Sequence, residues 1–211
     1  MCQNMRVALS GLALLLSCGI ATAHAQQRHF GGKMGPTIAT VHESADQSAG
    51  YGRRVSLGGG GFVVLPLGSR MSVQIEGLYT PKGGKFQEQT DITTTLILDY
   101  FEIPLLGRIA VTRSPSQSVH VFGGPSAGLR INAKQQVAYT GSVIKSGFTD
   151  DIRADIKRFE LGLIAGAGVD VGSHGVIDAR YFWGMSDVNR DASDGNHIRN
   201  RGLTILIGLR F

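Results

Sequence analysis

Charged residues recur at alternate positions inside apolar segments of this chain, where a charge needs either a partner or a chemical role. Glu76 follows Ile75, and Glu102 lies between Phe101 and Ile103. Alternate residues of a strand point to opposite faces, so the charges share one face and the apolar side chains the other. The same parity assigns nine residues to the polar face: Glu76, Glu102, Arg108, Arg130, Glu160, Asp170, Asp178, Arg180 and Arg210. Their near balance of five acids and four bases favours ion pairing, and the competing interpretation is a polar path for protons or small ions.

Three glutamates of this set, Glu76, Glu102 and Glu160, could form the carboxylate pair of a general acid–base catalyst. Arginines of the same face offer counter-charges to each carboxylate, which favours structural pairing. The histidines at positions 29, 42, 120, 174 and 197 form no recognisable catalytic motif. We therefore expect no catalytic residue, although catalytic triads are defined by geometry rather than by order in the sequence.

Metal and cofactor motifs are also weak. Gly58–Gly61 lacks the Lys–Ser/Thr of a phosphate-binding loop. Asp187, Asp191 and Asp194 lack the spacing and the final glutamate of a calcium loop, so a solvated loop is expected there. No cofactor and no metal are expected, and the scattered positive charge gives no nucleic-acid surface.

Eight segments of the sequence alternate apolar and polar residues with a period of two and could position these charges. They are approximately Phe30–Val41, Arg54–Pro66, Met71–Lys82, Thr95–Val111, Val119–Ala133, Lys157–Val171, Val176–Ser186 and Gly202–Phe211. Short connections alternate strictly with long polar ones, of which Lys134–Ile156 is the longest. This pattern predicts an all-β fold, an eight-stranded antiparallel up-and-down transmembrane β-barrel with tight turns at one end and long loops at the other.

A soluble barrel with an apolar interior would also alternate. The polar face here combines charges with many glycines, whereas most lysines, Lys82 and Lys157 among them, are placed in loops or at strand ends. A narrow polar lumen fits this composition better than a water-facing surface does. The residues Tyr51, Tyr79, Tyr100, Tyr181 and Trp183 are interpreted as interface aromatics.

The N-terminus has the features of a cleaved secretory signal. Arg6 precedes an apolar stretch, Val7–Ala21, which is too short for a spanning helix, and Ala23–Ala25 fits a cleavage site. Residues 1–25 are thus expected to be a signal peptide and residues 26–211 the barrel domain, with cleavage after Ala23 as a second option. A lipoprotein is a minor alternative, because Leu16 is bulky for a lipobox. Both cysteines lie in the signal, so no disulfide is expected.

Several segments resemble the eight-stranded outer-membrane barrels of the PorT-like type. The segments are Ser72–Tyr79, Lys82–Gly84, Tyr100–Leu106, Val121–Pro125, Gly166–Gly168, Ala179–Tyr181 and Gly208–Phe211. The resemblance covers nearly the whole mature chain and implies an outer-membrane location. It implies little about function, although PorT-like proteins proper are linked to a protein secretion system.

The sequence thus predicts an integral protein of the bacterial outer membrane with a non-enzymatic role, structural or in surface recognition through its external loops. A narrow pore and a lipid-modifying barrel enzyme are the alternatives. Expected partners are the outer-membrane lipid, the barrel-assembly machinery, for which the terminal Phe211 serves as a signal, and an unknown partner bound by Lys134–Ile156.

Overall fold

The computed structural model describes residues 28–43, 52–89, 92–114, 116–139, 147–190 and 197–211. The expected signal peptide lies outside these residues. The strands are β1 (His29–Glu43), β2 (Arg54–Pro66), β3 (Met71–Gln89), β4 (Ile92–Arg113), β5 (Gln117–Tyr139), β6 (Gly147–Asp151), β7 (Phe159–Val171), β8 (Gly175–Gly184) and β9 (Ile198–Arg210). Within the described part of the chain, no helix has the length and hydropathy needed to cross a membrane.

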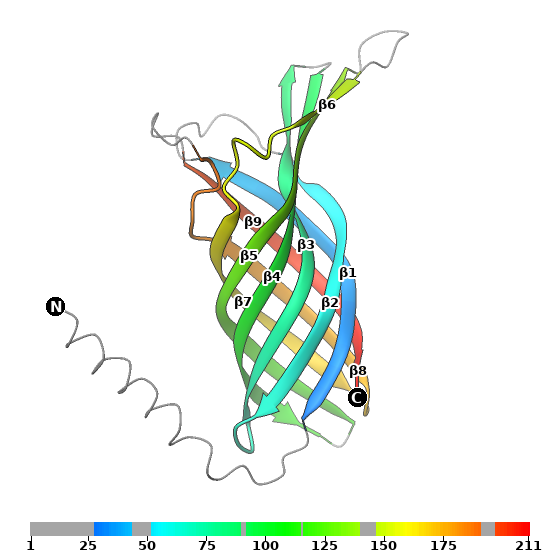
Figure 1. Cartoon of the computed structure of the whole chain (residues 1–211). Coiled ribbons are helices and arrows are strands. Elements are labelled where there is room, and N and C mark those ends of the chain that lie inside the picture. The colour runs from blue at the N-terminus through cyan, green and yellow to red at the C-terminus, as the bar shows by residue number, and fades with distance from the viewer. Residues whose placement is uncertain (1–27, 44–51, 90–91, 115, 140–146, 191–196) are drawn as a thin grey trace, which may run out of the picture.

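Eight of these strands form a closed ring (Figure 1). Each pairs antiparallel with its neighbours in the order β4-β3-β2-β1-β9-β8-β7-β5, and the pairing of β4 with β5 closes the ring. The short strand β6 lies outside the ring and pairs with β5. The predicted eight-stranded antiparallel up-and-down barrel is confirmed.

The first and last strands meet as expected. Gly31 is the register partner of Arg210, and Phe30 and Phe211 exchange backbone hydrogen bonds of 3.1 and 2.7 Å. A closed ring leaves no sheet edge with unpaired amides, which is the condition for crossing lipid with strands.

Residue parity along the ring strands separates the two faces of the barrel wall. In β4, Phe101, Ile103 and Leu105 are about half exposed, whereas Tyr100, Glu102 and Leu106 are no more than 3% exposed. Large apolar side chains therefore cover the outside, and charged residues, glycines and a few apolar residues fill the inside, as the alternation predicts.

Strand lengths differ from the expectation on one side of the ring. β2 has the expected bounds, but β3, β4 and β5 continue to Gln89, Ile92 and Tyr139, so the expected loop Gly83–Thr94 is mostly strand. The expected loop Lys134–Ile156 likewise contains the end of β5 and all of β6. Apolar alternation fades in these segments, yet backbone pairing does not require it, and β-branched residues such as Thr93 favour strands.

The extended ends of these strands form a four-stranded sheet that stands above the ring (Figure 1). Gly83, Ile97, Lys134 and Asp151 are register partners in one row across β3, β4, β5 and β6. We call the part beyond this row the projecting sheet: Gly83–Gln89, Ile92–Ile97, Lys134–Tyr139 and Gly147–Asp151. Gly83 has a φ of +102°, and a Cβ there would lie 2.1 Å from the Leu96 oxygen, so only glycine fits where β3 leaves the ring.

The two ends of the barrel differ in their connections. Both strand termini of the ring, His29 and Arg210, lie at the end that carries the short connections after β2, β4 and β7 (Figure 1). We call this the turn end. The opposite end, with the projecting sheet, is the loop end.

A closed barrel resists detergent until it is heated. We expect the purified mature chain to migrate faster in gel electrophoresis before boiling than after it, with a β-sheet circular dichroism spectrum. A band that does not shift, together with a helical spectrum, would contradict the closed ring.

Candidate functional site in the barrel interior

The interior of the ring holds layers of paired charges and apolar side chains. Nearest the turn end, Asp170 of β7 accepts hydrogen bonds from Arg210 of β9 (2.7 Å) and Arg108 of β4 (3.3 Å). The Arg108 guanidinium also donates to Gln74 at 2.7 Å and contacts the His120 ring nitrogens at 3.0 and 3.1 Å. Three sides of the ring are thereby tied together around one carboxylate.

The next layer is a four-residue cluster of alternating charge. Lys33 of β1 donates to Glu76 and to Asp178, each at 2.6 Å. Arg180 donates to the same two carboxylates, at 2.5 Å to Glu76 and 2.9 Å to Asp178. Because β3 and β8 are four places apart in the ring of eight, the Glu76–Arg180 pair crosses the full diameter of the barrel. All four side chains are at least 96% buried, and their formal charges cancel.

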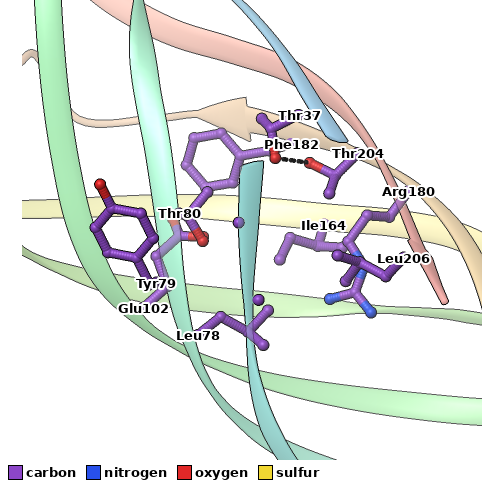
Figure 2. Close-up of a pocket in the computed structure, with 12 residues that line it drawn as sticks. Thr37, Leu78, Tyr79, Thr80, Glu102, Ile164, Arg180, Phe182, Thr204 and Leu206 are labelled. Atoms are coloured by element: carbon purple, nitrogen blue, oxygen red, sulfur yellow. Dashed lines mark hydrogen bonds between the residues drawn. The ribbon is translucent and has the colours of Figure 1, made fainter. Parts of the chain in front are cut away.

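Above this cluster the interior becomes apolar. Leu106, Phe122, Ile164 and Phe182 pack together from β4, β5, β7 and β8. The cavity beside them, which Figure 2 shows, has a volume of about 20 Å³, room for about one water molecule. At its far wall, Thr37 and Thr204 share a hydroxyl hydrogen bond of 3.1 Å across the β1–β9 seam (Figure 2).

A second ionic cluster follows toward the loop end. Lys82 Nζ lies 2.5 Å from Glu102 and 3.0 Å from Glu160, and it sits 3.1 Å from the centroid of the Phe182 ring. A cation over an aromatic face gains further stabilisation where water is excluded. Asn200 of β9 donates to the second oxygen of Glu160 at 3.0 Å.

The loop end is closed by apolar side chains. This loop-end cluster comprises Val41, Leu96, Leu98, Tyr100, Ala133, Ile156 and Val188. Val41 belongs to β1 and Ala133 to β5, which lie opposite each other in the ring, so the cluster spans the mouth. Ile156 and Val188 come from the segments after β6 and β8, which fold over the opening.

Seven of the nine predicted polar-face residues are buried inside the barrel, in the two ionic clusters and around Asp170: Glu76, Glu102, Arg108, Glu160, Asp170, Asp178 and Arg180. Arg210 is partly exposed at the turn end, where it reaches Asp170. Arg130 does not join them, because its guanidinium turns toward the loop end and donates to the Arg153 carbonyl at 2.9 Å.

Sequence reasoning missed two interior cations, Lys33 and Lys82. The glycines around Lys33 blurred the alternation of β1, and the prediction that Lys82 ends its strand was wrong. Lys82 has the parity of Glu76, so continuing the alternation along β3 would have found it. With both lysines in place of Arg130, the interior holds five acids and five strong bases.

Tyr100 is fully buried in the loop-end cluster, so its interpretation as an interface aromatic was wrong, whereas Tyr79 and Trp183 are exposed on the outer face.

Asp187 holds together the residues around it. Its carboxylate accepts hydrogen bonds from the backbone amides of Asn189 and Ile198, both at 3.0 Å, and contacts the His197 ring. Burial opposes ionisation, but these hydrogen bonds outweigh it and lower the pKa of Asp187.

Removing one member of the central cluster leaves buried charges without a partner. We expect Arg180→Met to lower the free energy of unfolding by about 3–5 kcal/mol. The matched variant Arg130→Met, at a partly exposed site outside the clusters, should cost no more than about 0.5 kcal/mol. Urea unfolding of both variants in lipid vesicles measures the difference, and equal costs would contradict the structural role of the cluster.

The comparison with protein-family models agrees with this architecture. A model of the outer membrane protein beta-barrel domain matches residues 24–190. Among solved structures, the chain is similar to Ail, the attachment invasion locus protein of Yersinia pestis, with 15% identity over 88% of this chain and 100% of that one and a TM-score of 0.46. Neisserial surface protein A matches with 14% identity over 88% and 100% and a TM-score of 0.45. OprG from Pseudomonas aeruginosa matches with 11% identity over 87% and 95% and a TM-score of 0.48.

No curated protein matches the chain in sequence. The family model nevertheless covers most of the chain, including the strands that carry the central cluster. The chain belongs to the outer membrane protein beta-barrel domain family, and it is a β-barrel protein of the bacterial outer membrane.

Proposed function

We propose that this protein is a non-enzymatic recognition protein, in which a plugged barrel holds the projecting sheet above the outer membrane to bind an extended polypeptide segment. Outer-membrane barrels place their short turns in the periplasm and their long loops outside the cell. The turn end would then face the periplasm and the projecting sheet the exterior.

The observation that carries the proposal is the length of the strands on one side. β4 and β5 have 22 and 23 residues, whereas β7 and β8 have 13 and 10. A membrane-spanning strand needs about 9–11 residues. At a rise of about 3.3 Å per residue, the six residues Lys134–Tyr139 of β5 extend the sheet by roughly 20 Å.

The outer edge of the projecting sheet is a candidate binding surface. Among the described residues, β6 pairs only with β5, so its other edge offers backbone amides and carbonyls for a further strand. All five residues of β6 are exposed, including Phe148, which could contact a side chain of the added strand.

The base of this edge is held by a short turn. The Asp151 carboxylate accepts hydrogen bonds from the Arg153 side chain and amide, and these bonds lower the pKa of Asp151 to about 2. At the base of the sheet, Leu96, Ala133 and Ile156 pack in the loop-end cluster. An edge that is fixed before binding loses less conformational entropy on binding, which favours affinity.

The filled interior of the barrel favours a plugged barrel over a narrow pore. Ion pairs cross the lumen, apolar layers separate the ionic clusters, and the side chains of an eight-stranded barrel fill its interior. A conducting path would have to break buried pairs, each at a cost of several kcal/mol.

Export and assembly belong to the same proposal. Residues 1–25 would direct the chain across the inner membrane, and the aromatic Phe211 would present the last strand to the assembly machinery. Phe211 is exposed at the turn end beside Phe30, with 6.2 Å between the ring centroids, which makes it accessible to such a partner. A narrower, PorT-like role in secretion stays a prediction.

A peptide library displayed on phage tests the binding edge. Peptides selected on the barrel in lipid nanodiscs should lose at least tenfold in affinity when residues 147–151 are replaced by an equally long Gly-Ser segment. The control replaces Gly172–His174, a turn at the opposite end, with glycine and serine, and should bind normally. Peptides that bind both variants equally well would contradict the proposal that the edge of β6 is the binding surface.

Conductance measurements in planar lipid bilayers test whether side chains close the lumen. We expect no stepwise conductance from the intact protein at neutral pH, because charged pairs and apolar layers fill the lumen. Reproducible single-channel steps that change size in Arg108→Gln or Arg180→Gln would establish a lumen path and contradict the plug.

A further inference from the structure

The turn end of the barrel contains a polar cavity that the proposed recognition function does not use. Its volume is about 100 Å³, enough for about three water molecules or one small polyatomic ion. The cavity opens between the ring strands below the Arg108–Asp170 pair, on the opposite side of the protein from the projecting sheet.

Positive charge dominates the lining of this cavity. Four arginines face it, namely Arg70, Arg108, Arg113 and Arg210, together with His29 and His120. Asp170 is the one carboxylate among the described residues that line the cavity. The four guanidinium groups and the one carboxylate leave the lining with a net positive charge.

Two of the arginines have no counter-ion in the described part of the chain. Asp170 already accepts from Arg108 and Arg210, whereas no carboxylate lies within 4.0 Å of the Arg70 or Arg113 guanidinium. Guanidinium groups that lack a carboxylate partner and line one polar cavity favour the binding of an anion there.

The arrangement of the donors indicates the class of anion. Arg70 follows β2, Arg108 and Arg113 come from β4 and Arg210 from β9, so the guanidinium groups approach from several sides. Planar guanidinium forks bind phosphate oxygens with two parallel hydrogen bonds, which a monatomic anion cannot accept. The hydroxyls of Ser72 and Ser118 add two short neutral donors to the same cavity.

We propose that this cavity, at the turn end of the barrel, is a binding site for a phosphate group. The cavity has no opening toward the loop end, because the central cluster and the layer of Leu106, Phe122, Ile164 and Phe182 close the lumen above it. A phosphate therefore enters and leaves on the periplasmic side only. The group comes either from free phosphate or from the headgroup of a phospholipid in the inner leaflet.

Isothermal titration of the mature protein in an uncharged detergent, with inorganic phosphate as the probe at low salt, tests the proposal. We expect saturable binding that equal ionic strength of chloride does not reproduce. The double variant Arg70→Gln/Arg113→Gln alters only exposed residues outside the ionic clusters, and should weaken binding by roughly tenfold or more. The matched variant Arg199→Gln, an exposed arginine of β9 at the loop end, should bind phosphate as the unmodified protein does.

A second arm separates the two sources of phosphate. Short-chain phosphatidic acid is titrated below its micelle concentration in parallel with inorganic phosphate. Binding of both probes supports a site for the free ion, and binding of the lipid alone, again lost in Arg70→Gln/Arg113→Gln, assigns the site to a headgroup. The absence of binding for both probes, or binding that the double variant leaves unchanged, overturns the proposal.

Discussion

The pairing of buried charges across a narrow lumen is the constraint on which the rest of this structure depends. The interior of an eight-stranded barrel is only wide enough for side chains, so each interior charge must find its partner within a few ångströms. The Glu76–Arg180 pair meets this requirement across the full diameter, with Lys33 and Asp178 completing a neutral cluster. Strands that are far apart in the sequence are thereby held in one register.

Charge pairing also distinguishes the interior of the barrel from its two ends. Inside the ring, ionic clusters alternate with apolar layers, and the formal charges cancel over the whole set. Among the described residues, Arg70 and Arg113 at the turn end are arginines without a carboxylate partner. The loop end instead presents exposed backbone on β6. The two binding surfaces that we propose therefore lie at the ends of the barrel, while the paired charges of the interior stabilise the fold.

The sequence predicted the ring well because alternation is a local signal. Each strand shows on its own which face is apolar, so the inward direction of Glu102, Glu160 and Asp178 followed from parity alone. Partners could not be predicted in this way, because the Lys33–Glu76 contact joins residues 43 positions apart and depends on the stagger of the strands. Arg130 is a second case in which partners could not be predicted. Its position in the alternation places it on the inner face, but its long side chain near the rim turns toward the Arg153 carbonyl. The projecting sheet escaped prediction because hydrogen-bonded pairing continues after the apolar alternation has ended.

The central claim is that Glu76 and Arg180 act as one buried unit, and a double-mutant cycle tests it most directly. The variants Glu76→Gln, Arg180→Met and their combination are unfolded with urea in lipid vesicles, and the coupling free energy is taken from the four stabilities. The account predicts a coupling of about 2 kcal/mol or more, because each single variant leaves the other charge buried with fewer partners. A coupling near zero, with strictly additive effects, would contradict it.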